Sequence, residues 1–430
     1  MARSLTPIDA YALINLIVKE ATGQDAAIQA VDSSTFVSVG ETILNTGTEN
    51  TLNAISIVLG RTFMAVRPYE AKLKILNTMN SGLFTSRMRK ISYYSREAQA
   101  SGAFNTDLYT YHAMGYDNGT NAGDSLPTMW EQNQPVPLEL NFAGRSVWDD
   151  STTVYENQLQ QAFKDESSFI DFMQGIMVEK GNDIESQKEA FNRMTLLNYM
   201  AGLYDMNAGG AGCGAIDMTA AYNARFNTTK TATDLLTTDL KSFYEFFVST
   251  VRLLSDTLEN RSTKYHWSPT SALGAGYVLM RHTPKSKQKL ILYKPFLYEA
   301  EAMVLPEIFN DNYLNIENYE GVTFWQNELN SASIDVTPAI PDMSDPTEQT
   351  VGAQVQLDYV LGVLYDEDAI LVDYQLDESY STPVEARKRY RNIWWHFSKN
   401  SINDFTENGI LLYLGAGGNA KKSAKAAKSE

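Results

Sequence analysis

The sequence predicts an α+β protein with an extended arm, and three observations lead to this prediction. Residues 92–135 contain only four Leu, Ile, Val or Met side chains but seven aromatic ones. Around residues 167–203, apolar side chains recur at helical spacing. Later segments alternate apolar and polar residues or are apolar throughout, which is typical of strands. With 430 residues, 43% of them hydrophobic, the chain is long enough for two or three units with sizeable cores.

Two short helices are predicted near the N-terminus. Residues 9–19 place four apolar side chains on one helical face, and this helix is expected to end near Gly23. A second helix is expected over residues 48–59, closing at Gly60. Pro68 then breaks the pattern, because the residue before a proline avoids the helical conformation.

We interpret the aromatic segment 92–135 as an arm that lies on another surface. Ordering the backbone costs about 1–2 kcal/mol per residue, which four aliphatic side chains cannot offset. Disordered linkers are poor in aromatic residues, whereas aromatic side chains bury large areas with few rotors to freeze. The alternative is a long surface loop on a monomer. The side chains predicted to make the contact are Tyr93, Tyr94, Phe104, Tyr109, Tyr111 and Trp130.

The arm is predicted to be a long hairpin. Its returning limb is the strand around residues 136–142, where apolar residues alternate at period two. Pro135 and Pro137 place this strand at an edge, because proline cannot donate to a sheet. The outgoing limb is expected near residues 87–94.

The helix predicted over about residues 167–203 is about 54 Å long, so it must span the molecule. It is expected to end at Gly202. Gly175 and Gly181 each cost about 1 kcal/mol relative to Ala and indicate a bend or a tight crossing. The predicted buried stripe consists of Phe169, Phe172, Met173, Ile176, Met177, Ile184, Phe191, Met194 and Ala201.

A Gly- and Ala-rich link, residues 208–215, separates this helix from another unit, which begins with an amphipathic helix over residues 240–258. A hairpin is predicted in which residues 357–364 and 369–374 flank an acidic turn. Further strands are expected at residues 289–293, 322–325, 393–397 and 410–414, the last apolar on both faces.

The charge of the chain argues against a high-affinity nucleic-acid binder. With 52 acidic and 35 basic residues, the formal net charge is −17, whereas phosphate contacts need a basic surface. The segment 415–430 has four lysines and one glutamate and no side chain larger than Ala among its apolar residues, so we expect a disordered tail of charge +3 on a body of −20. No apolar run is long enough to span a membrane, and residues 1–10 lack a secretory pattern, so we expect a cytoplasmic protein.

No catalytic, cofactor-binding or metal site is predicted. The four histidines show no metal-ligand spacing, and the single cysteine, Cys213, has no partner. Neither a phosphate-binding loop nor a nucleophile elbow is present. The triplet Asp366-Glu367-Asp368 fits a solvated turn; the alternative is a cation site or an acid–base pair in a soluble hydrolase.

A basic cluster stands out in the acidic chain, and three interpretations are open: a nucleic-acid patch, a salt-bridging interface or a solvated loop. We favour the interface, because arginine binds carboxylates through two parallel bonds and carboxylates are in excess. The cluster comprises Arg387, Lys388, Arg389 and Arg391, of which the three arginines are predicted contacts.

The order of these parts resembles the major capsid protein of tailed bacteriophages, which has the Hong Kong 97-like (Johnson) fold. Phrases of the sequence are similar to such proteins over about residues 31–414. They include Val39-Gly40-Glu41-Thr42, Leu59-Gly60-Arg61-Thr62, Arg281-His282-Thr283-Pro284, residues 289–296, residues 392–397 and residues 403–409.

The resemblance implies a shell subunit, not an enzyme, with an N-terminal arm, an extended β-hairpin loop, a long spine helix, and peripheral and axial domains. The implied divisions are an arm with entry helices (1–66), the extended loop region (67–150), a peripheral domain with the spine helix (151–206), an axial domain with intervening peripheral strands (207–356), axial and closing peripheral strands (357–414) and the basic tail (415–430).

The resemblance also implies partners. Such subunits form hexamers and pentamers of an icosahedral head, assembled in the bacterial cytoplasm, that encloses double-stranded DNA with weak, nonspecific contact. A separate scaffolding protein, a portal and decoration proteins are expected, and no membrane. Some relatives join a loop lysine to a neighbour's asparagine, but residues 92–135 contain no lysine and Lys90 lies at the root, so no cross-link is expected. Within the same fold, the alternative is an encapsulin-like compartment.

Overall fold

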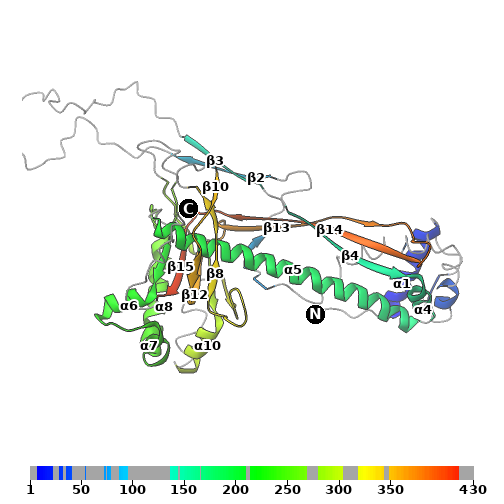
Figure 1. The fold of residues 1–430 in the computed structure, drawn as a ribbon, viewed down its shortest axis with the longest axis horizontal. Helices are drawn as coiled ribbons and strands as arrows, with labels where there is room; N and C mark the ends of the chain where they lie inside the picture. Colours follow the sequence, from blue (N-terminus) through cyan, green and yellow to red (C-terminus); the bar gives the residue numbers. More distant parts are fainter. Residues whose placement is uncertain are drawn as a thin grey trace, which may run out of the picture.

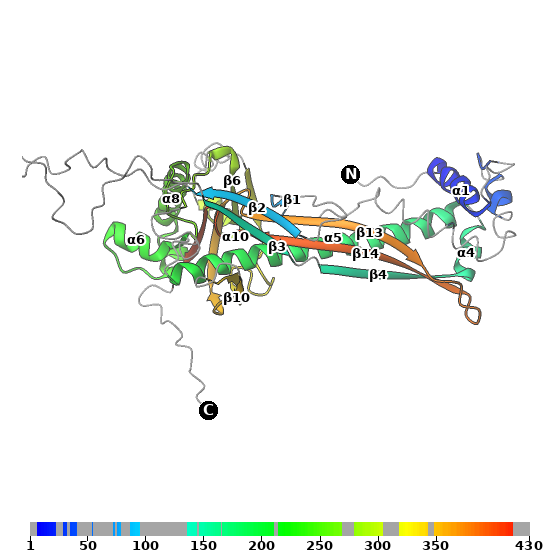
Figure 2. The same cartoon turned by 90° about the horizontal axis from the view of Figure 1, so that it is seen from above.

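One helix, α5 (Glu166–Ala208), runs along the molecule and connects a compact unit of sheet and helices to an elongated unit of long strands (Figure 1). Figure 2 shows the same helix from above, with the long strands beside it. The computed structural model describes residues 7–22, 29–31, 35–40, 54, 72–73, 75–78, 87–94, 136–143, 146–164, 166–209, 214–268, 279–303, 318–342 and 348–415.

The long helix confirms the sequence prediction but ends later than expected. At 43 residues α5 is about 65 Å long. Gly202 lies inside the helix because the ring of Phe405 occupies the space that a Cβ would need, so this glycine serves packing and not termination. Phe169, Ile184 and Phe191 are buried as predicted, whereas Met194 is 57% exposed, contrary to the prediction.

The glycines of α5 give a direct stability test. No atom of the described residues lies within 4 Å of the position of a Cβ at Gly175. Gly175→Ala should therefore raise the free energy of unfolding by about 0.5–1 kcal/mol, the helix-propensity difference. The matched control, Gly202→Ala, should lower it, because the methyl group meets the Phe405 ring. Urea unfolding of the unassembled subunit measures both; a loss at Gly175 would contradict the packing described.

The compact unit is built on a five-stranded sheet in which β12 and β15 are buried on both faces. β15 and β6 flank β12 in antiparallel pairs, while β5 and β7 pair in parallel at the two edges. The order across the sheet is β5 (Gly214–Asp217), β15 (Gly409–Leu414), β12 (Tyr359–Asp366), β6 (Gln288–Tyr293) and β7 (Asn318–Val322).

Helices cover this sheet, and their ends follow local capping chemistry. Asp217 accepts the backbone N–H of Thr219 at 2.9 Å at the start of α6, and Thr231 and Asp234 form a capping box at α7. α8 confirms the helix predicted at 240–258 and buries its apolar face around Phe296. The helices are α6 (Met218–Phe226), α7 (Ala232–Thr237), α8 (Leu240–Glu259), the 3₁₀ turn η1 (Lys285–Lys287) and α10 (Lys294–Met303).

The elongated unit is a four-stranded sheet that packs beside the first half of α5, with a second hydrophobic core at its far end. This core joins α1 (Pro7–Thr22), α4 (Glu156–Ala162) and α5 to β14, through side chains such as Ile14, Phe169 and Trp395. The order across the sheet is β1 (Asn77–Thr78), β13 (Ile370–Ser381), β14 (Tyr390–Asn403) and β4 (Ser146–Tyr155). Two small antiparallel pairs are β8 (Ile334–Val336) with β11 (Val355–Leu357), and β9 (Ala339–Pro341) with β10 (Gln349–Val351).

The prediction of a hairpin around residues 365–368 is wrong. β12 pairs with β6 and β15 of the compact unit, whereas β13 pairs with β1 and β14 of the elongated unit. The chain therefore changes sheets at this turn. Both strands begin with residues that are apolar on both faces, so periodicity gave no indication that their partners differ.

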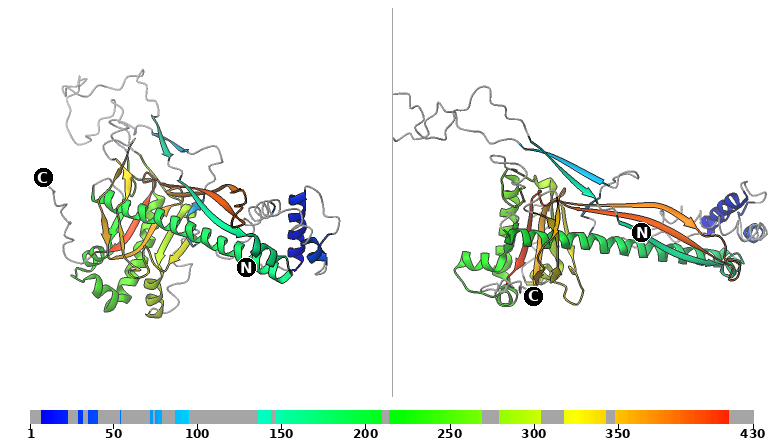
Figure 3. Two further views of the ribbon diagram at one scale, coloured as in Figure 1. Left: turned by 45° about the vertical axis from the view of Figure 1, so that its right-hand side comes forward. Right: turned by 45° about the horizontal axis from the view of Figure 1, so that its top comes forward.

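The projecting hairpin is formed by β2 (Arg87–Tyr94) and β3 (Val136–Ala143), which pair in antiparallel register from Arg87 with Ala143 to Tyr94 with Val136. Figure 3 shows it standing apart from both sheets. Both limbs were predicted from the sequence. The rest of the predicted arm, the helix predicted at 48–59 apart from Ala54, Cys213 and the tail beyond residue 415 lie outside the described residues.

Candidate functional site at the root of the hairpin

The turn between β14 and β15, residues 404–408, is buried although four of its five side chains are polar. Asp404 organises it: one carboxylate oxygen accepts the backbone N–H of Thr406 at 2.8 Å and its hydroxyl at 2.6 Å. Outside contacts fix the turn further, because the N–H of Trp267 donates to the carbonyl of Phe405 at 2.7 Å. The turn thus presents carboxylates from a rigid frame.

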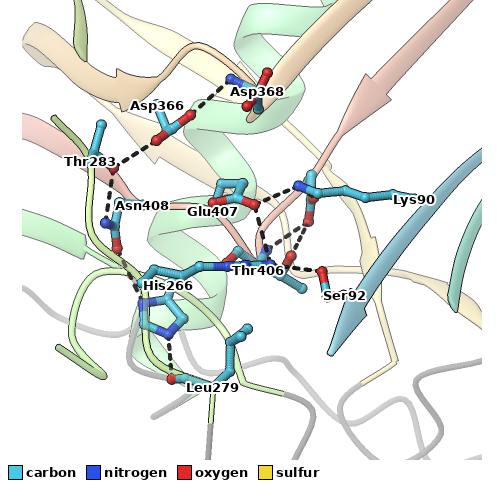
Figure 4. Close-up of polar contacts among 12 residues, drawn as sticks. Lys90, Ser92, His266, Leu279, Thr283, Asp366, Asp368, Thr406, Glu407 and Asn408 are labelled. Carbon is cyan, nitrogen blue, oxygen red and sulfur yellow. Dashed lines mark hydrogen bonds and ion pairs between the residues drawn. The ribbon is translucent and has the colours of Figure 1, made fainter. Parts of the chain in front are cut away.

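Lys90 of β2 reaches this turn from the hairpin. Its Nζ donates to Asp404 and, at 2.6 Å, to Glu407 (Figure 4). Arg281 lies 3.3 Å from the same Glu407 oxygen and donates to the Ser92 hydroxyl at 3.1 Å. We call Lys90, Ser92, Arg281, Asp404 and Glu407 the root junction. Through Lys90 and Ser92, which are two residues apart in β2, the root junction links the hairpin to the compact unit.

The electrostatics of the root junction explain why its parts depend on one another. Burial of the Lys90 amine opposes its charge, but Asp404 and Glu407 together outweigh this and raise the pKa of Lys90. Burial raises the pKa of Glu407, whereas the positive charges of Lys90 and Arg281 lower it; burial has the larger effect, so the pKa is raised overall. Among the described residues, removing Lys90 leaves the buried Asp404 carboxylate without a paired cation, and removing Glu407 leaves Arg281 without a paired carboxylate.

A second set of polar contacts supports the turn from the other side. The Asn408 amide donates to the Thr283 hydroxyl at 3.0 Å, which donates to Asp366 at 2.7 Å. The His266 ring contacts Asn408 Oδ1 at 3.2 Å through Nδ1 and the Leu279 carbonyl at 2.9 Å through Nε2 (Figure 4). These buried bonds hold the turn in one conformation.

His266 makes this support dependent on pH. Burial lowers the pKa of His266 below its ordinary value, so the folded subunit binds a proton at this ring less readily than the unfolded chain, which protonates near pH 6.5. Stability is therefore lost as the pH falls below about 6.5, because the unfolded state binds the proton. Asp366 and Glu407, whose pKa values burial raises, act in the opposite direction.

The difference in pH dependence of stability between wild type and His266→Gln isolates the contribution of His266, because Asp366 and Glu407 are present in both proteins. We expect the urea midpoint of wild type to fall more between about pH 7 and about pH 5.5 than that of the variant. Equal pH dependence would mean that His266 does not titrate differently in the folded state.

The structure places the other predicted contact residues as follows. Tyr93 and Tyr94 lie in β2, while Phe104, Tyr109, Tyr111 and Trp130 lie outside the described residues. Arg387 and Arg389 are exposed on the turn between β13 and β14. Arg391 is 6% exposed and its Nε donates to the Thr382 carbonyl, so in the subunit this arginine stabilises its own turn; its contact with a neighbour stays a prediction.

The expectation of a solvated acidic turn holds only in part. Asp368 is exposed, but Asp366 is 4% exposed and accepts the Asp368 N–H at 3.0 Å as well as the Thr283 hydroxyl. Within the described residues, no group of three or more His, Cys, Asp or Glu could hold a metal ion. The described part of the chain likewise contains no helix that is both long and apolar enough to cross a membrane.

The described residues thus combine a long helix that joins two sheets with a projecting hairpin fixed at its root. The family described as Phi29-like phage major capsid protein matches residues 128–413, about two thirds of the chain, and the chain belongs to this family. It is therefore a shell protein of a phage virion, and its described residues have the predicted α+β architecture.

Solved structures similar to this chain are also phage capsids. The capsid of Staphylococcus phage Andhra is 10% identical, covers 81% of this chain and 85% of its own, and has a TM-score of 0.47. The mature capsid of bacteriophage PhiM1 is 8% identical, with coverages of 80% and 87% and a TM-score of 0.39. Mycobacterium phage Adephagia is 9% identical, with coverages of 84% and 94% and a TM-score of 0.39. No curated protein matches the chain.

Proposed function

We propose that copies of this chain assemble as hexamers and pentamers into a closed icosahedral head around double-stranded DNA. The observation that carries the proposal is the root junction, because a hairpin held at two points can reach a neighbour from a defined direction. Hexamers and pentamers need similar contacts at slightly different angles, which a rigid body with an extended arm provides. Many weak contacts then add up through multivalency.

The basic turn between β13 and β14 is a second proposed contact with a neighbour. Three hydrogen bonds fix its backbone. Within the turn, the N–H of Glu385 donates to the Tyr390 carbonyl, and the N–H of Arg389 donates to the Glu385 carbonyl. From outside the turn, the N–H of Glu156 donates to the Arg389 carbonyl. The Arg389 side chain is 69% exposed, and its guanidinium lies 3.8 Å from the Glu156 carboxylate. Guanidinium groups presented in this way fit the carboxylates of an acidic neighbour.

The remaining partners belong to the same proposal. Assembly takes place in the host cytoplasm with a separate scaffolding protein, and the shell carries a portal and decoration proteins. Contact with DNA is weak and nonspecific, because the net charge of −17 repels phosphate. Residues 415–430 have a net charge of only +3, so they can displace few counterions from DNA.

Coexpression with the phage scaffolding protein, followed by sedimentation and negative-stain electron microscopy, tests the proposal. We expect closed particles with hexamers and pentamers, and no loss of particles when residues 416–430 are deleted. The proposal would be contradicted if the wild-type chain, coexpressed with the scaffolding protein, formed nothing but monomers or open sheets. Particles from infected cells that carry protein cargo and no DNA would instead indicate an encapsulin-like compartment.

A further inference from the structure

Strand β4 forms one edge of the four-stranded sheet, and its first half is exposed. In the order β1-β13-β14-β4, only β14 pairs with β4 among the described strands. The side chains of Val147 and Trp148 are 64% and 48% exposed. A long edge strand with exposed apolar side chains is a template for another chain. This edge therefore has the properties of an interaction surface.

A buried lysine lies beside this edge, with no counter-charge among the described residues. Lys399 of β14 is 5% exposed, and its Nζ lies 4.3 Å from the centre of the Trp148 ring and 5.9 Å from that of Phe191. The register pairs Lys399 with Ser146 and Phe397 with Trp148, so the lysine and the tryptophan share one face of the sheet. In the described part of the chain, the amine has contacts with aromatic rings but no ion-pair or hydrogen-bond partner.

A second lysine makes the surroundings more positive. Lys188 of α5 is paired with Glu185 at 2.9 Å, so this carboxylate serves Lys188 and not Lys399. Burial and the charge of Lys188 both lower the pKa of Lys399. A cation–π contact compensates a buried ammonium less well than a bonded carboxylate does. We call Trp148, Lys188, Phe191 and Lys399 the edge site; within the described part of the chain, Lys188 has a paired carboxylate and Lys399 does not.

We propose that the edge site binds a carboxylate of a second copy of this chain, which docks along β4. The inference rests on the proposed function, because shell assembly brings copies together. Charge favours this occupant: each copy carries 52 acidic residues against 35 basic ones, whereas DNA is repelled by the same excess. The partner's carboxylate supplies the counter-charge that Lys399 lacks among the described residues of its own subunit.

Lys399→Met tests the inference, because it keeps the length and apolar contacts of the side chain and removes its charge. The unassembled variant should unfold at the same or a higher urea concentration, since an unpaired buried cation is lost. Its particle yield with the scaffolding protein should fall several-fold, and Lys399→Arg should restore much of it. The control, Lys230→Met, removes a half-exposed lysine paired with Asp239 and should leave the yield unchanged.

The outcomes separate this inference from the proposed function. If wild type forms particles and Lys399→Met forms them equally well, the edge site does not bind a neighbour, while the proposed function stands. Loss of subunit stability together with particle yield would assign Lys399 an internal structural role and overturn the inference. A defect confined to DNA retention would make phosphate the ligand and also overturn it. Absence of particles from wild type itself would contradict the proposed function.

Discussion

Lys90→Met is expected to lower the free energy of unfolding of the unassembled subunit by about 3 kcal/mol, at the lower end of the range for a broken buried ion pair. Asp404 is 2% exposed at its side chain and Glu407 12%, so both carboxylates lose a cation where water cannot replace it. The Lys90 side chain itself is 27% exposed, and for this reason we expect a loss at the lower end of the range for buried ion pairs. Urea unfolding measures the change.

A matched lysine controls for the loss of any surface charge. Lys285 pairs with Asp256, whose side chain is 62% exposed, so Lys285→Met should change the free energy of unfolding far less than Lys90→Met does. The double variant Lys90→Met with Asp404→Asn should be more stable than Lys90→Met alone, because Lys90 is the cation paired with Asp404 among the described residues, whereas Glu407 keeps Arg281 at 3.3 Å. Equal losses at Lys90 and Lys285 would show that the root junction is no stronger than a surface pair.

Deleting residues 95–135 is expected to abolish closed particles while leaving the subunit folded. Tyr94 and Val136 are register partners, so a two-residue Asn-Gly turn can join β2 to β3 without disturbing the root junction. The deleted segment has few aliphatic side chains, so the loss of subunit stability should be small. Circular dichroism and urea unfolding check the fold, and sedimentation checks assembly.

A second variant separates the aromatic contacts of the arm from its length. Replacing Phe104, Tyr109, Tyr111 and Trp130 with Ser keeps the chain length and should still reduce particle yield strongly, because aromatic side chains carry most of the energy at interfaces. Normal particles from the deletion would refute the role of the arm. Global unfolding would instead place the segment in the core of its own subunit.

Elements with a strong period were predicted well from the sequence because their pattern is local. α8 and α5 show helical spacing over many turns, and β14 alternates Ile393, Trp395 and Phe397 toward one core. The end of α5 was misplaced because a glycine at a helix crossing and a glycine at a helix end look alike in a sequence. Only the position of Phe405 distinguishes the two.

The pairing of strands and the root junction could not be predicted in the same way. β12 and β13 adjoin in sequence but enter different sheets, because their partners come from distant segments. Lys90 and Asp404 are 314 positions apart, and no local pattern links them. One signal was present: the turn 404–408 is rich in polar residues between two strands with buried side chains, and such a turn has to find partners for its polar groups.

Cryo-electron microscopy of the assembled wild-type particle tests the central claim most directly. We predict that in hexamers and pentamers alike the hairpin leaves its subunit at the root junction, with Lys90 bonded to Asp404 and Glu407, and that residues 95–135 lie on a neighbouring subunit. A hairpin folded back onto its own subunit, or a shell held together without contacts from this segment, would contradict the account.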